Sequence, residues 1–296
     1  MILAAGLGTR LRPLTENRPK ALIPVVNQPA VSRVIEYLKT QGVSEIVVNA
    51  HHHHAQLLSY LDSGRRFGLP IQVRVEEEIL GTGGGLKNTE DFWDEDPFLL
   101  INGDILTDID LAEAYERHLK WGGLATLVLH ECEPFNQIQV DERGYVLDIA
   151  KQNLAGRLAF TGIHVVSPAL LSHIPPGVFC DIIVCYQKLI STGNPVQAFI
   201  SKGHAWRDIG SVQSYVQANR ELAGGRFVVG PGCEVDSSVR FGEWAVVGEK
   251  SVLEKGAEIR ASILWERARV KKDVRVVNSV VTGSREVTGD LFGQLY

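Results

Sequence analysis

The sequence has 296 residues, of which 45% are apolar and 22% charged, with a net charge of -5. The small acidic excess argues against a general nucleic-acid-binding protein, and no apolar run approaches the roughly 18 residues of a membrane span. The start of the chain shows no signal-peptide pattern and the four cysteines fit no zinc spacing, so we expect a cytoplasmic protein with reduced thiols and no membrane partner.

Apolar runs of strand length alternate with helical patterns up to about residue 200. We expect strands at 2–5, 45–50, 71–76, 98–102, 124–130 and 196–200, and helices at 30–38, 55–62 and 110–121. This order predicts an α/β fold with a doubly wound, Rossmann-like, mostly parallel sheet. Ligands of such sheets bind beyond the carboxyl ends of the strands, so functional groups are expected just after Ala5 and just after Asn102.

The last 71 residues, 226–296, have a different pattern. Apolar residues recur there at a step of six, with one slip of a single residue, and glycines lie between them. This pattern predicts a small left-handed β-helix of about three coils, in which glycines turn the corners, and a first domain at 1–225. The alternative is a β-rich tail with chance spacing. The expected inward residues are Val229, Val235, Phe241, Val247, Leu253, Ile259, Leu264, Val270 and Val276, and the glycines are Gly230, Gly242, Gly248 and Gly256.

A glycine-rich loop with basic residues follows the first strand. Gly6 and Gly8 allow backbone N–H groups to approach a phosphate, and Arg10 and Lys20 supply the positive charge that a triphosphate needs. The loop is neither a P-loop nor a dinucleotide fingerprint, in which Leu11 would be glycine. A tight turn with solvated arginines is the alternative, but the RPK sequence that follows favours phosphate binding.

The segments GLGTRLRPLT (6–15) and RPKALIPVVNQP (18–29) together resemble the signature of sugar-1-phosphate nucleotidylyltransferases. Further motifs of that family have counterparts in the expected order. They are LGTGG (80–84), NGD (102–104), FTGI (160–163) and WRDIG (206–210) with Tyr215 and ANR (218–220) after it. The hexapeptide tail is also common in that family, so the resemblance covers nearly the whole chain.

The resemblance implies transfer of a nucleotidyl group from a nucleoside triphosphate to a sugar 1-phosphate, with Mg²⁺ as cofactor. Asp104 and Asp208 would hold the Mg²⁺, because it prefers carboxylate and phosphate oxygens. Arg10 would stabilise the triphosphate, and Lys20 would bridge the two reacting phosphates. The implied nucleotide contacts are Leu3, Ala5, Gly6, Gly8, Thr9, Arg10, Leu80, Gly81, Thr82 and Asn102, and the implied sugar-phosphate contacts are Asn136, Lys151, Thr161, Gly162 and Asp181.

The sequence departs from the family pattern near the sugar. The family usually has a glycine near Asn136 that contacts the sugar, and Ala150 replaces the usual glutamate before Lys151. Asp181 is as well suited to cap a helix as to contact a sugar hydroxyl. The triple glycine Gly83–Gly85 resembles enzymes of mannose, heptose or muramic-acid phosphates more than the thymidylyl enzymes that act on glucose, so GTP with mannose 1-phosphate is our first expectation. Uridylyl or thymidylyl transfer to another sugar 1-phosphate is the alternative.

Other classes of function are open to the same sequence. A hexapeptide acyltransferase would need a histidine in the tail, and none follows His204. A non-catalytic regulatory or assembly subunit would have lost Arg10, Lys20, Asp104 or Asp208. We expect the tail to mediate homo-oligomer formation. The run His51–His54 is interpreted as a polar loop rather than a metal site.

Overall fold

The protein is described by a computed structural model that covers residues 1–133 and 135–296. It divides into two compact units: unit 1 is Met1–Leu7 with Arg33–Trp206, and unit 2 is Gly8–Ser32 with Arg207–Tyr296. Unit 2 thus adds residues 8–32 and 207–225 to the predicted tail domain. Across the described ranges, no helix combines the length and apolarity of a membrane span.

Unit 1 is built on one nine-stranded sheet. Its strands are β1 (Ile2–Leu3), β4 (Ile46–Ala50), β5 (Ile71–Val75), β6 (Phe98–Asn102), β8 (Ala125–His130), β9 (Asn136–Val140), β10 (Val146–Ile149), β11 (Leu158–Val166) and β12 (Gln197–Ile200). The order is β10-β9-β11-β6-β1-β4-β5, and β8 pairs with β11 and β12. Neighbours β6, β1, β4 and β5 run parallel, whereas β11 is antiparallel to β6, β8 and β9. The predicted α/β sheet is confirmed, with antiparallel strands added beside its parallel half.

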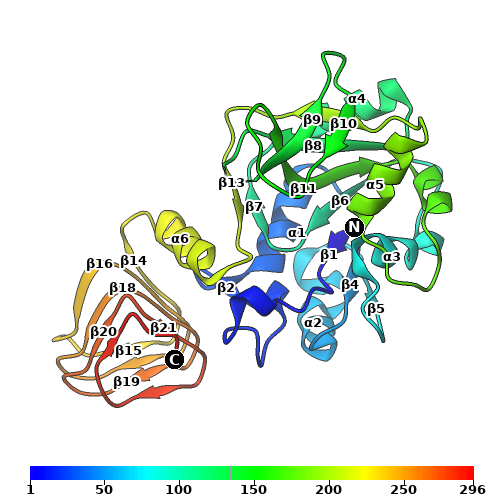
Figure 1. Ribbon diagram of the computed structural model, residues 1–296. Coiled ribbons are helices and arrows are strands. Elements are labelled where there is room, and N and C mark those ends of the chain that lie inside the picture. Colours follow the sequence, from blue (N-terminus) through cyan, green and yellow to red (C-terminus); the bar gives the residue numbers. More distant parts are fainter. Residues whose placement is uncertain (134) are drawn as a thin grey trace. The chain divides into compact units, whose positions relative to one another are not determined.

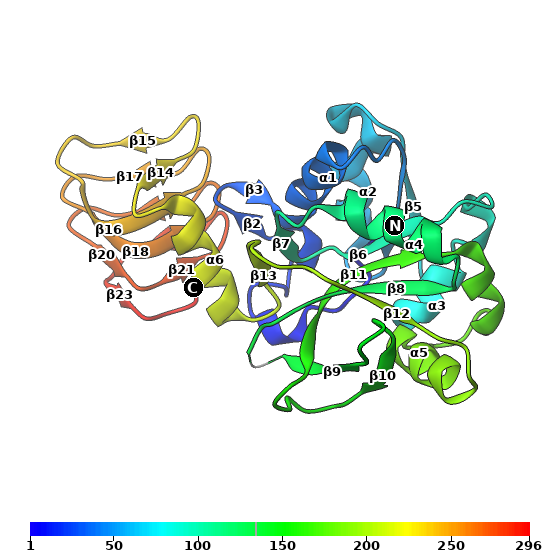
Figure 2. The same ribbon diagram turned by 90° about the horizontal axis from the view of Figure 1, so that it is seen from above.

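Helices cover both faces of this sheet, with α3 (Gly81–Lys87) and α5 (Ile182–Ser191) on one side and α1 (Ala30–Thr40) and α4 (Leu111–Trp121) on the other (Figures 1 and 2). Leu86, Ile182 and Tyr186 pack into the same core as Leu100 and Leu127, because alternate strand residues point to one face. The remaining elements of unit 1 are α2 (His54–Leu61), β7 (Ile105–Thr107) and the 3-10 helices η3 (Asp62–Phe67), η4 (Glu90–Phe92) and η5 (Pro168–His173).

The chain leaves unit 1 within β13 (Trp206–Asp208) and enters α6 (Val212–Ala223) of unit 2. Ser211 and Ser214 form a capping box at the start of α6, and Gly224 ends the helix at φ 60°. Unit 2 also holds the N-terminal loop with η1 (Thr9–Leu11), η2 (Lys20–Leu22) and the strands β2 (Pro24–Val25) and β3 (Gln28–Pro29).

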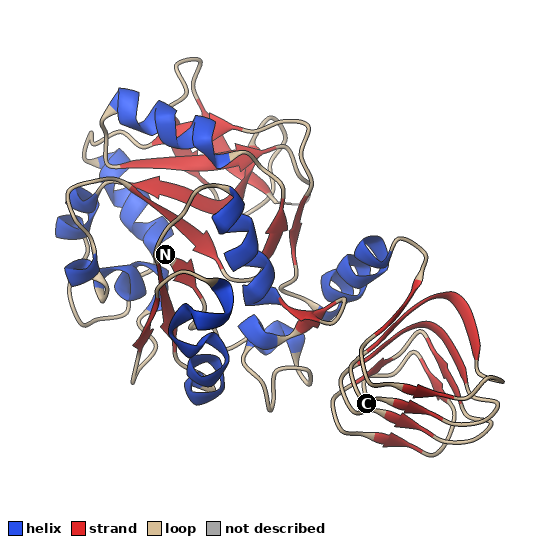
Figure 3. Ribbon diagram, turned by 180° about the vertical axis from the view of Figure 1, so that it is seen from behind, coloured by secondary structure: helices blue, strands red, loops and turns tan. Residues whose placement is uncertain are grey.

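The tail forms parallel coils, as predicted, and is consistent with a left-handed β-helix (Figure 3). Glu234, Val252, Arg269 and Glu286 pair in succession, so one turn takes 17 or 18 residues and explains the slip in the repeat. The strands are β14 (Phe227–Val229), β15 (Glu234–Val235), β16 (Arg240–Val247), β17 (Val252–Leu253), β18 (Glu258–Leu264), β19 (Arg269–Val270), β20 (Arg275–Val277), β21 (Val280–Val281), β22 (Glu286–Val287) and β23 (Leu291–Phe292).

Burial follows the six-residue step inside the coils but not at their first turn. The predicted inward residues from Val247 to Val276 are buried, whereas Val229 is 43% and Val235 39% exposed, because no coil precedes them. Phe241 is half-buried. The predicted inward pattern therefore holds from the second turn onward.

Among the four tail glycines predicted to turn corners, the backbone conformation supports that role at Gly256 alone. Of the four, only Gly256 has a left-handed backbone, while Lys250, Arg267 and Ser284 adopt positive φ without being glycine. A Cβ at Gly248 would instead clash with the backbone of Glu266 in the next coil. This glycine permits close stacking of coils rather than turning a corner.

Candidate functional site

The parallel half of the sheet gathers several predicted site residues at its carboxyl edge. Leu3 is paired with Asn49 on one side and Asn102 on the other, so all three lie at the same level. The Gly103 N–H donates to the Leu3 carbonyl at 2.9 Å, which turns the chain toward half-buried Asp104 just beyond the edge. The predicted positions of Leu3, Asn102 and Asp104 are thus adjacent, as the doubly wound fold requires.

Gly162 in β11 lies directly against Asn102. Its φ is +76°, and a Cβ there would lie 2.5 Å from Asn102 Nδ2 and 2.6 Å from Ile105 Cδ1. The neighbouring Thr161 hydroxyl is buried and donates to the Val128 carbonyl at 2.7 Å. Thr161 therefore supports the sheet with its side chain, and its carbonyl accepts from Trp206 Nε1 at 2.9 Å, whereas glycine at 162 is required for space.

The predicted nucleotide loop is the start of α3, a helix that the glycine-rich sequence concealed. The N–H groups of Gly83 and Gly84 both donate to the Cys180 carbonyl, at 2.8 and 3.1 Å. A Cβ at Gly81 would lie 2.7 Å from that same oxygen. These glycines let the segment before α5 pack tightly against the helix N-terminus.

This packing brings a predicted nucleotide residue and a predicted sugar residue together. The Ile182 N–H donates to the Thr82 hydroxyl at 2.9 Å, and the Asp181 carboxylate is 3.4 Å from that hydroxyl. Asp181 also caps α5 by accepting from the Ile183 N–H at 2.9 Å. The capping interpretation of Asp181 is therefore confirmed. The predicted contact of Asp181 with a sugar hydroxyl stays a prediction, and its carboxylate lies beside the predicted nucleotide residue Thr82.

A buried polar network that sequence reasoning missed lies beneath this loop. Asn49 Oδ1 accepts from the Ala4 N–H at 2.7 Å, and Asn49 Nδ2 donates to Glu76 Oε1 at 2.7 Å. Glu76 Oε2 accepts from the Leu80 N–H at 2.9 Å. The network links the ends of β1, β4 and β5 to the first residue before α3.

The side-chain polar atoms of Asn136, a predicted sugar-phosphate residue, bond to residues just before it in the chain. Its Oδ1 accepts from the Cys132 N–H at 2.9 Å, and its Nδ2 donates to Glu133 Oε1 at 3.2 Å. Asn153 Nδ2 donates to the other oxygen of Glu133 at 2.5 Å. Lys151, by contrast, is an exposed side chain, so its amine is accessible to an anion.

In unit 2, the basic loop is folded tightly on itself. Gly8 has φ +62°, and a Cβ there would lie 2.7 Å from Thr15 Cγ2 and 3.3 Å from Lys20 Cβ. The Thr15 hydroxyl donates to the Gly8 carbonyl at 2.8 Å. Glycine at position 8 therefore brings the base of the Lys20 side chain close to the start of the loop.

Arg10 and Asp208 meet across a second glycine of unit 2. A Cβ at Gly210 would lie 2.5 Å from Asp208 Oδ1 and 2.7 Å from Arg10 Nη2. The Gly210 N–H donates to the same oxygen of Asp208. Three predicted catalytic residues, Arg10, Lys20 and Asp208, thus belong to one compact unit, while Asp104 belongs to the other.

The back of the basic loop is tied to the β-helix within unit 2. Trp265 Nε1 donates to the Tyr215 hydroxyl at 2.9 Å, and that hydroxyl donates to the Pro24 carbonyl at 2.8 Å. The Arg18 guanidinium lies 4.7 Å from the centre of the Trp265 ring and pairs with Glu266. Burial raises the pKa of Tyr215, so its hydroxyl stays protonated.

The histidines show one cluster that the sequence did not predict. His130, at the end of β8, is 3.1 Å from His204 through Nδ1 and Nε2. Burial and the neighbouring His204 lower the pKa of His130 to about 4. In the run after β4, His51 Nδ1 contacts the Glu76 carbonyl at 2.9 Å, and His54 opens α2. Residues 1–133 and 135–296 contain no group of three or more His, Cys, Asp or Glu side chains that could hold a metal.

The carboxylates of Asp104 and Asp208 fit Mg²⁺ chemically, since both offer hard oxygen donors at strand ends. Mg²⁺ keeps waters and takes substrate phosphates as further ligands, so it does not need a cluster of three protein side chains.

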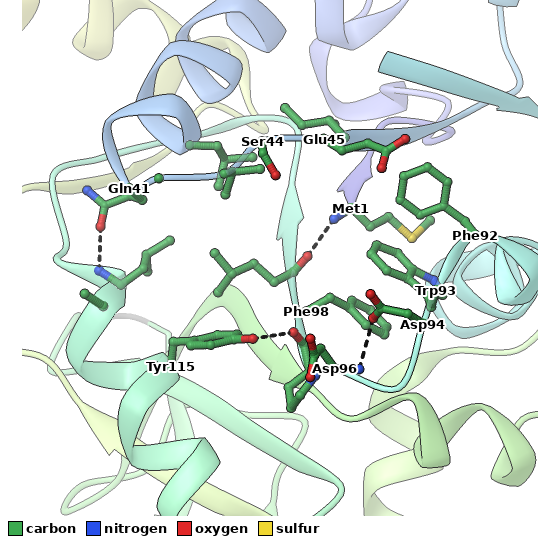
Figure 4. A pocket seen from close by; sticks show the side chains of 18 of the residues that line it. Met1, Gln41, Ser44, Glu45, Phe92, Trp93, Asp94, Asp96, Phe98 and Tyr115 are labelled. Atoms are coloured by element: carbon green, nitrogen blue, oxygen red, sulfur yellow. Dashed lines mark hydrogen bonds between the residues drawn. The ribbon is translucent and has the colours of Figure 1, made fainter. Parts of the chain in front are cut away.

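A pocket of about 570 Å³ opens at the other edge of the sheet, where β4 and β6 begin (Figure 4). Tyr115 and the carboxylates of Glu45, Asp94 and Asp96 line it, and its acidic lining would repel a triphosphate. The predicted site residues lie elsewhere, so this pocket is not the candidate site.

Comparison with known proteins identifies the family. The model of the family described as "Nucleotidyl transferase" matches residues 1–224. A UTP--glucose-1-phosphate uridylyltransferase of Synechocystis sp. is 29% identical, over 96% of this chain and 87% of the relative. Mannose-1-phosphate guanylyltransferase 1 of Arabidopsis thaliana is 27% identical, over 98% and 87% of the two chains.

Among solved structures, HddC from Yersinia pseudotuberculosis shares the fold. Its TM-score is 0.66 at 24% identity, over 75% of this chain and 97% of that chain. The match of the family model to three quarters of the sequence, together with this shared fold, leads to one conclusion: the chain belongs to the nucleotidyl transferase family.

Proposed function

We propose that this chain transfers a nucleotidyl group from a nucleoside triphosphate to a sugar 1-phosphate and releases pyrophosphate. The observation that carries the proposal is the folded basic loop, in which Gly8 brings Lys20 close and Gly210 brings Arg10 to Asp208. Two cations and a carboxylate around a glycine loop suit a polyphosphate and its metal.

The chemistry follows from the charges of the reactants. A phosphate oxygen of the sugar 1-phosphate attacks the α-phosphorus of the triphosphate, and the bond to the pyrophosphate leaving group breaks. The attacking phosphate is already anionic near neutral pH, so the protein needs no general base. Its task is to hold two repelling anions in line and to stabilise the developing charge.

Arg10 and Lys20 carry out that task in this proposal. Arg10 pairs with the triphosphate, and Lys20 bridges the attacking phosphate and the α-phosphate. Mg²⁺, held by Asp104 and Asp208, would neutralise charge on the phosphates and orient them. Lys151, exposed beside the Asn136 loop, supplies a third cation for the sugar phosphate.

For the substrate pair we propose GTP and mannose 1-phosphate, with uridylyl or thymidylyl transfer as the alternative. The similar proteins include both a guanylyltransferase and a uridylyltransferase. The glycines of α3 support the guanylyl choice through their likeness to the enzymes of mannose and heptose phosphates.

We also propose that the protein is cytoplasmic and assembles into homo-oligomers through its β-helix. The support is the first coil, where Phe227, Val229 and Val235 are exposed apolar side chains at an open end. Light scattering should give a smaller mass for Phe227→Lys/Val229→Lys than for the unchanged protein. Equal masses would refute this mode of assembly.

The catalytic proposal is tested by pyrophosphate release from purified variants with Mg²⁺. Lys20→Ala should lower kcat/KM by at least about 100-fold, because a charge that acts on the transition state is lost. Lys120→Ala is the matched control, since the Lys120 side chain is 80% exposed on α4. Unchanged kcat/KM in Lys20→Ala would refute the role of the loop and favour a non-catalytic subunit.

A further inference from the structure

We propose that Glu76 is a positioning residue for the nucleotide. Its carboxylate fixes the backbone just before α3 relative to β1, the strand that leads into the basic loop. The inference rests on the proposed function for the identity of the ligand. It assigns a role to a buried acid that none of the preceding chemistry uses.

Glu76 and Asn49 form a closed polar pair inside unit 1. Glu76 is 3% and Asn49 2% exposed, so water does not satisfy their polar atoms. The two side chains are joined at 2.7 Å, and a Cβ at Gly85 would lie 2.6 Å from Glu76 Oε1 and 2.5 Å from Asn49 Nδ2. Glycine at position 85 therefore leaves the space that the pair occupies.

The direction of each hydrogen bond in the chain is fixed by chemistry. The Ala4 N–H can only donate, so Asn49 must present its oxygen there and its NH₂ toward Glu76. The Leu80 N–H can also only donate, so residue 76 must accept from both sides. A carboxylate is the side-chain group of this size that accepts at both oxygens, and glutamine would place a donor against a donor.

The cost of this arrangement argues for a role. Both side-chain partners of Glu76 in the described ranges are neutral groups, an amide and a backbone N–H. A buried carboxylate held by neutral donors is expensive compared with an apolar residue of the same volume. In return, the buried carboxylate rigidly connects the ends of the neighbouring strands β1, β4 and β5, at the edge of the sheet where ligands bind (Figure 1).

The backbone around Glu76 is fixed independently of its side chain. The Glu76 N–H donates to the Ala50 carbonyl at 2.8 Å, and its carbonyl contacts His51 Nδ1 at 2.9 Å. Because these bonds fix the Glu76 backbone, its carboxylate also fixes the position of the Leu80 N–H that donates to it. The loss of this one bond should let the backbone at the Leu80 N–H shift without unfolding the sheet, because the Cys180 backbone still holds the Leu80 carbonyl and the N–H groups of Gly83 and Gly84.

The test uses an exchange of acid and amide. Glu76→Gln creates a donor–donor contact, and Asn49→Asp places two carboxylates together. The double variant Asn49→Asp/Glu76→Gln restores every hydrogen bond. Its carboxylate at position 49 accepts from the Ala4 N–H and from the amide NH₂ at position 76, and the amide oxygen at position 76 accepts from the Leu80 N–H. Glu77→Gln, at the exposed neighbouring position, is the matched control for loss of charge.

Three readouts separate positioning from a general structural effect. They are nucleotide affinity by calorimetry with GTP and with UTP, the KM values for triphosphate and for sugar 1-phosphate, and the melting temperature. Each single variant should weaken nucleotide affinity and raise the triphosphate KM by about tenfold, with little change in the KM for sugar 1-phosphate. The double variant should return to within about threefold of the unchanged protein.

Two results would overturn the inference. One is nucleotide affinity in Glu76→Gln equal to that of Glu77→Gln, and the other is a double variant no better than the weaker single variant. If a single variant does not fold, nucleotide affinity of the double variant decides, since a restored network predicts restored binding. Failure of the proposed function has a different signature: the unchanged protein would bind nucleotide yet release no pyrophosphate with any sugar 1-phosphate.

Discussion

Replacement of Gly162 by alanine tests whether the candidate site depends on one close contact. The backbone there has φ +76°, which costs an alanine about 1–2 kcal/mol. The new methyl group would also lie 2.5 Å from Asn102 Nδ2 and 2.6 Å from Ile105 Cδ1. Forcing apart a packed contact costs about 1–3 kcal/mol more, so we expect a total loss of roughly 2–5 kcal/mol.

Gly193 offers a matched control, because it has φ +81° but no heavy atom within 4 Å of the position that a Cβ would take. Gly193→Ala should therefore cost only the backbone term of about 1–2 kcal/mol. Urea denaturation of both variants measures the difference. Pyrophosphate release should fall more in Gly162→Ala, because displacement of Asn102 disturbs the strand end beside Asp104. Equal losses of stability and activity in the two variants would refute the reasoning.

Three further predictions concern buried groups. Burial lowers the pKa of His164 from 6.5 to about 3, so this group takes up a proton on unfolding, and its contribution to stability is complete above pH 6.5 and is lost as the pH falls. Between pH 7 and pH 5, urea titrations should show that His164→Gln loses about 2 kcal/mol less of its free energy of unfolding than the unchanged protein, in which His130 also contributes to the acid loss. Equal losses in the two proteins would contradict the buried neutral state of His164. Tyr215→Phe leaves the buried Trp265 N–H without its acceptor, so it should lower the free energy of unfolding by about 1–3 kcal/mol. Urea denaturation measures this loss, and no change would contradict the described contact. Gly248→Ala should lower the melting temperature of the β-helix, because the added methyl group obstructs the next coil. Gly289→Ala is the control, since no heavy atom lies within 4 Å of its Cβ position. Equal melting temperatures of the two variants would argue against the stacking role of Gly248.

The elements with strong periodicity could be predicted from the sequence. The helix at 110–121 is observed as Leu111–Trp121, and the strand at 98–102 has the predicted bounds. Both signals are local: an N-cap aspartate begins the helix, and a short apolar run forms a strand buried on both faces. The six-residue step likewise predicted the β-helix, because every coil repeats the same inward position.

Helix α3 could not be predicted in the same way. Its sequence GTGGGLK has four glycines, which are poor helix formers, and its stability comes from contacts that lie far away in the chain. The Cys180 carbonyl satisfies two N–H groups at its start, and close packing against that segment requires the glycines. A local pattern carries no information about such a partner.

The candidate residues come from motifs in the sequence, but the contacts among them could not be predicted from it. The signature motif identified Arg10 and Lys20, whereas the Arg18–Glu266 pair spans 248 positions and gives no local signal. Asn49 and Glu76, 27 positions apart, are polar residues at strand ends and look like loop residues in sequence. Only the parallel pairing of β4 with β5 brings them together.

The central claim is that this chain makes a nucleotide sugar, and identification of the product tests it most directly. The purified protein should be incubated with Mg²⁺, each of four nucleoside triphosphates and a panel of sugar 1-phosphates, and the products analysed by mass spectrometry with pyrophosphate measured in parallel. We predict one preferred pair, GTP with mannose 1-phosphate, that yields the nucleoside diphosphate sugar and pyrophosphate in equal amounts. The absence of both products for every pair would contradict the claim.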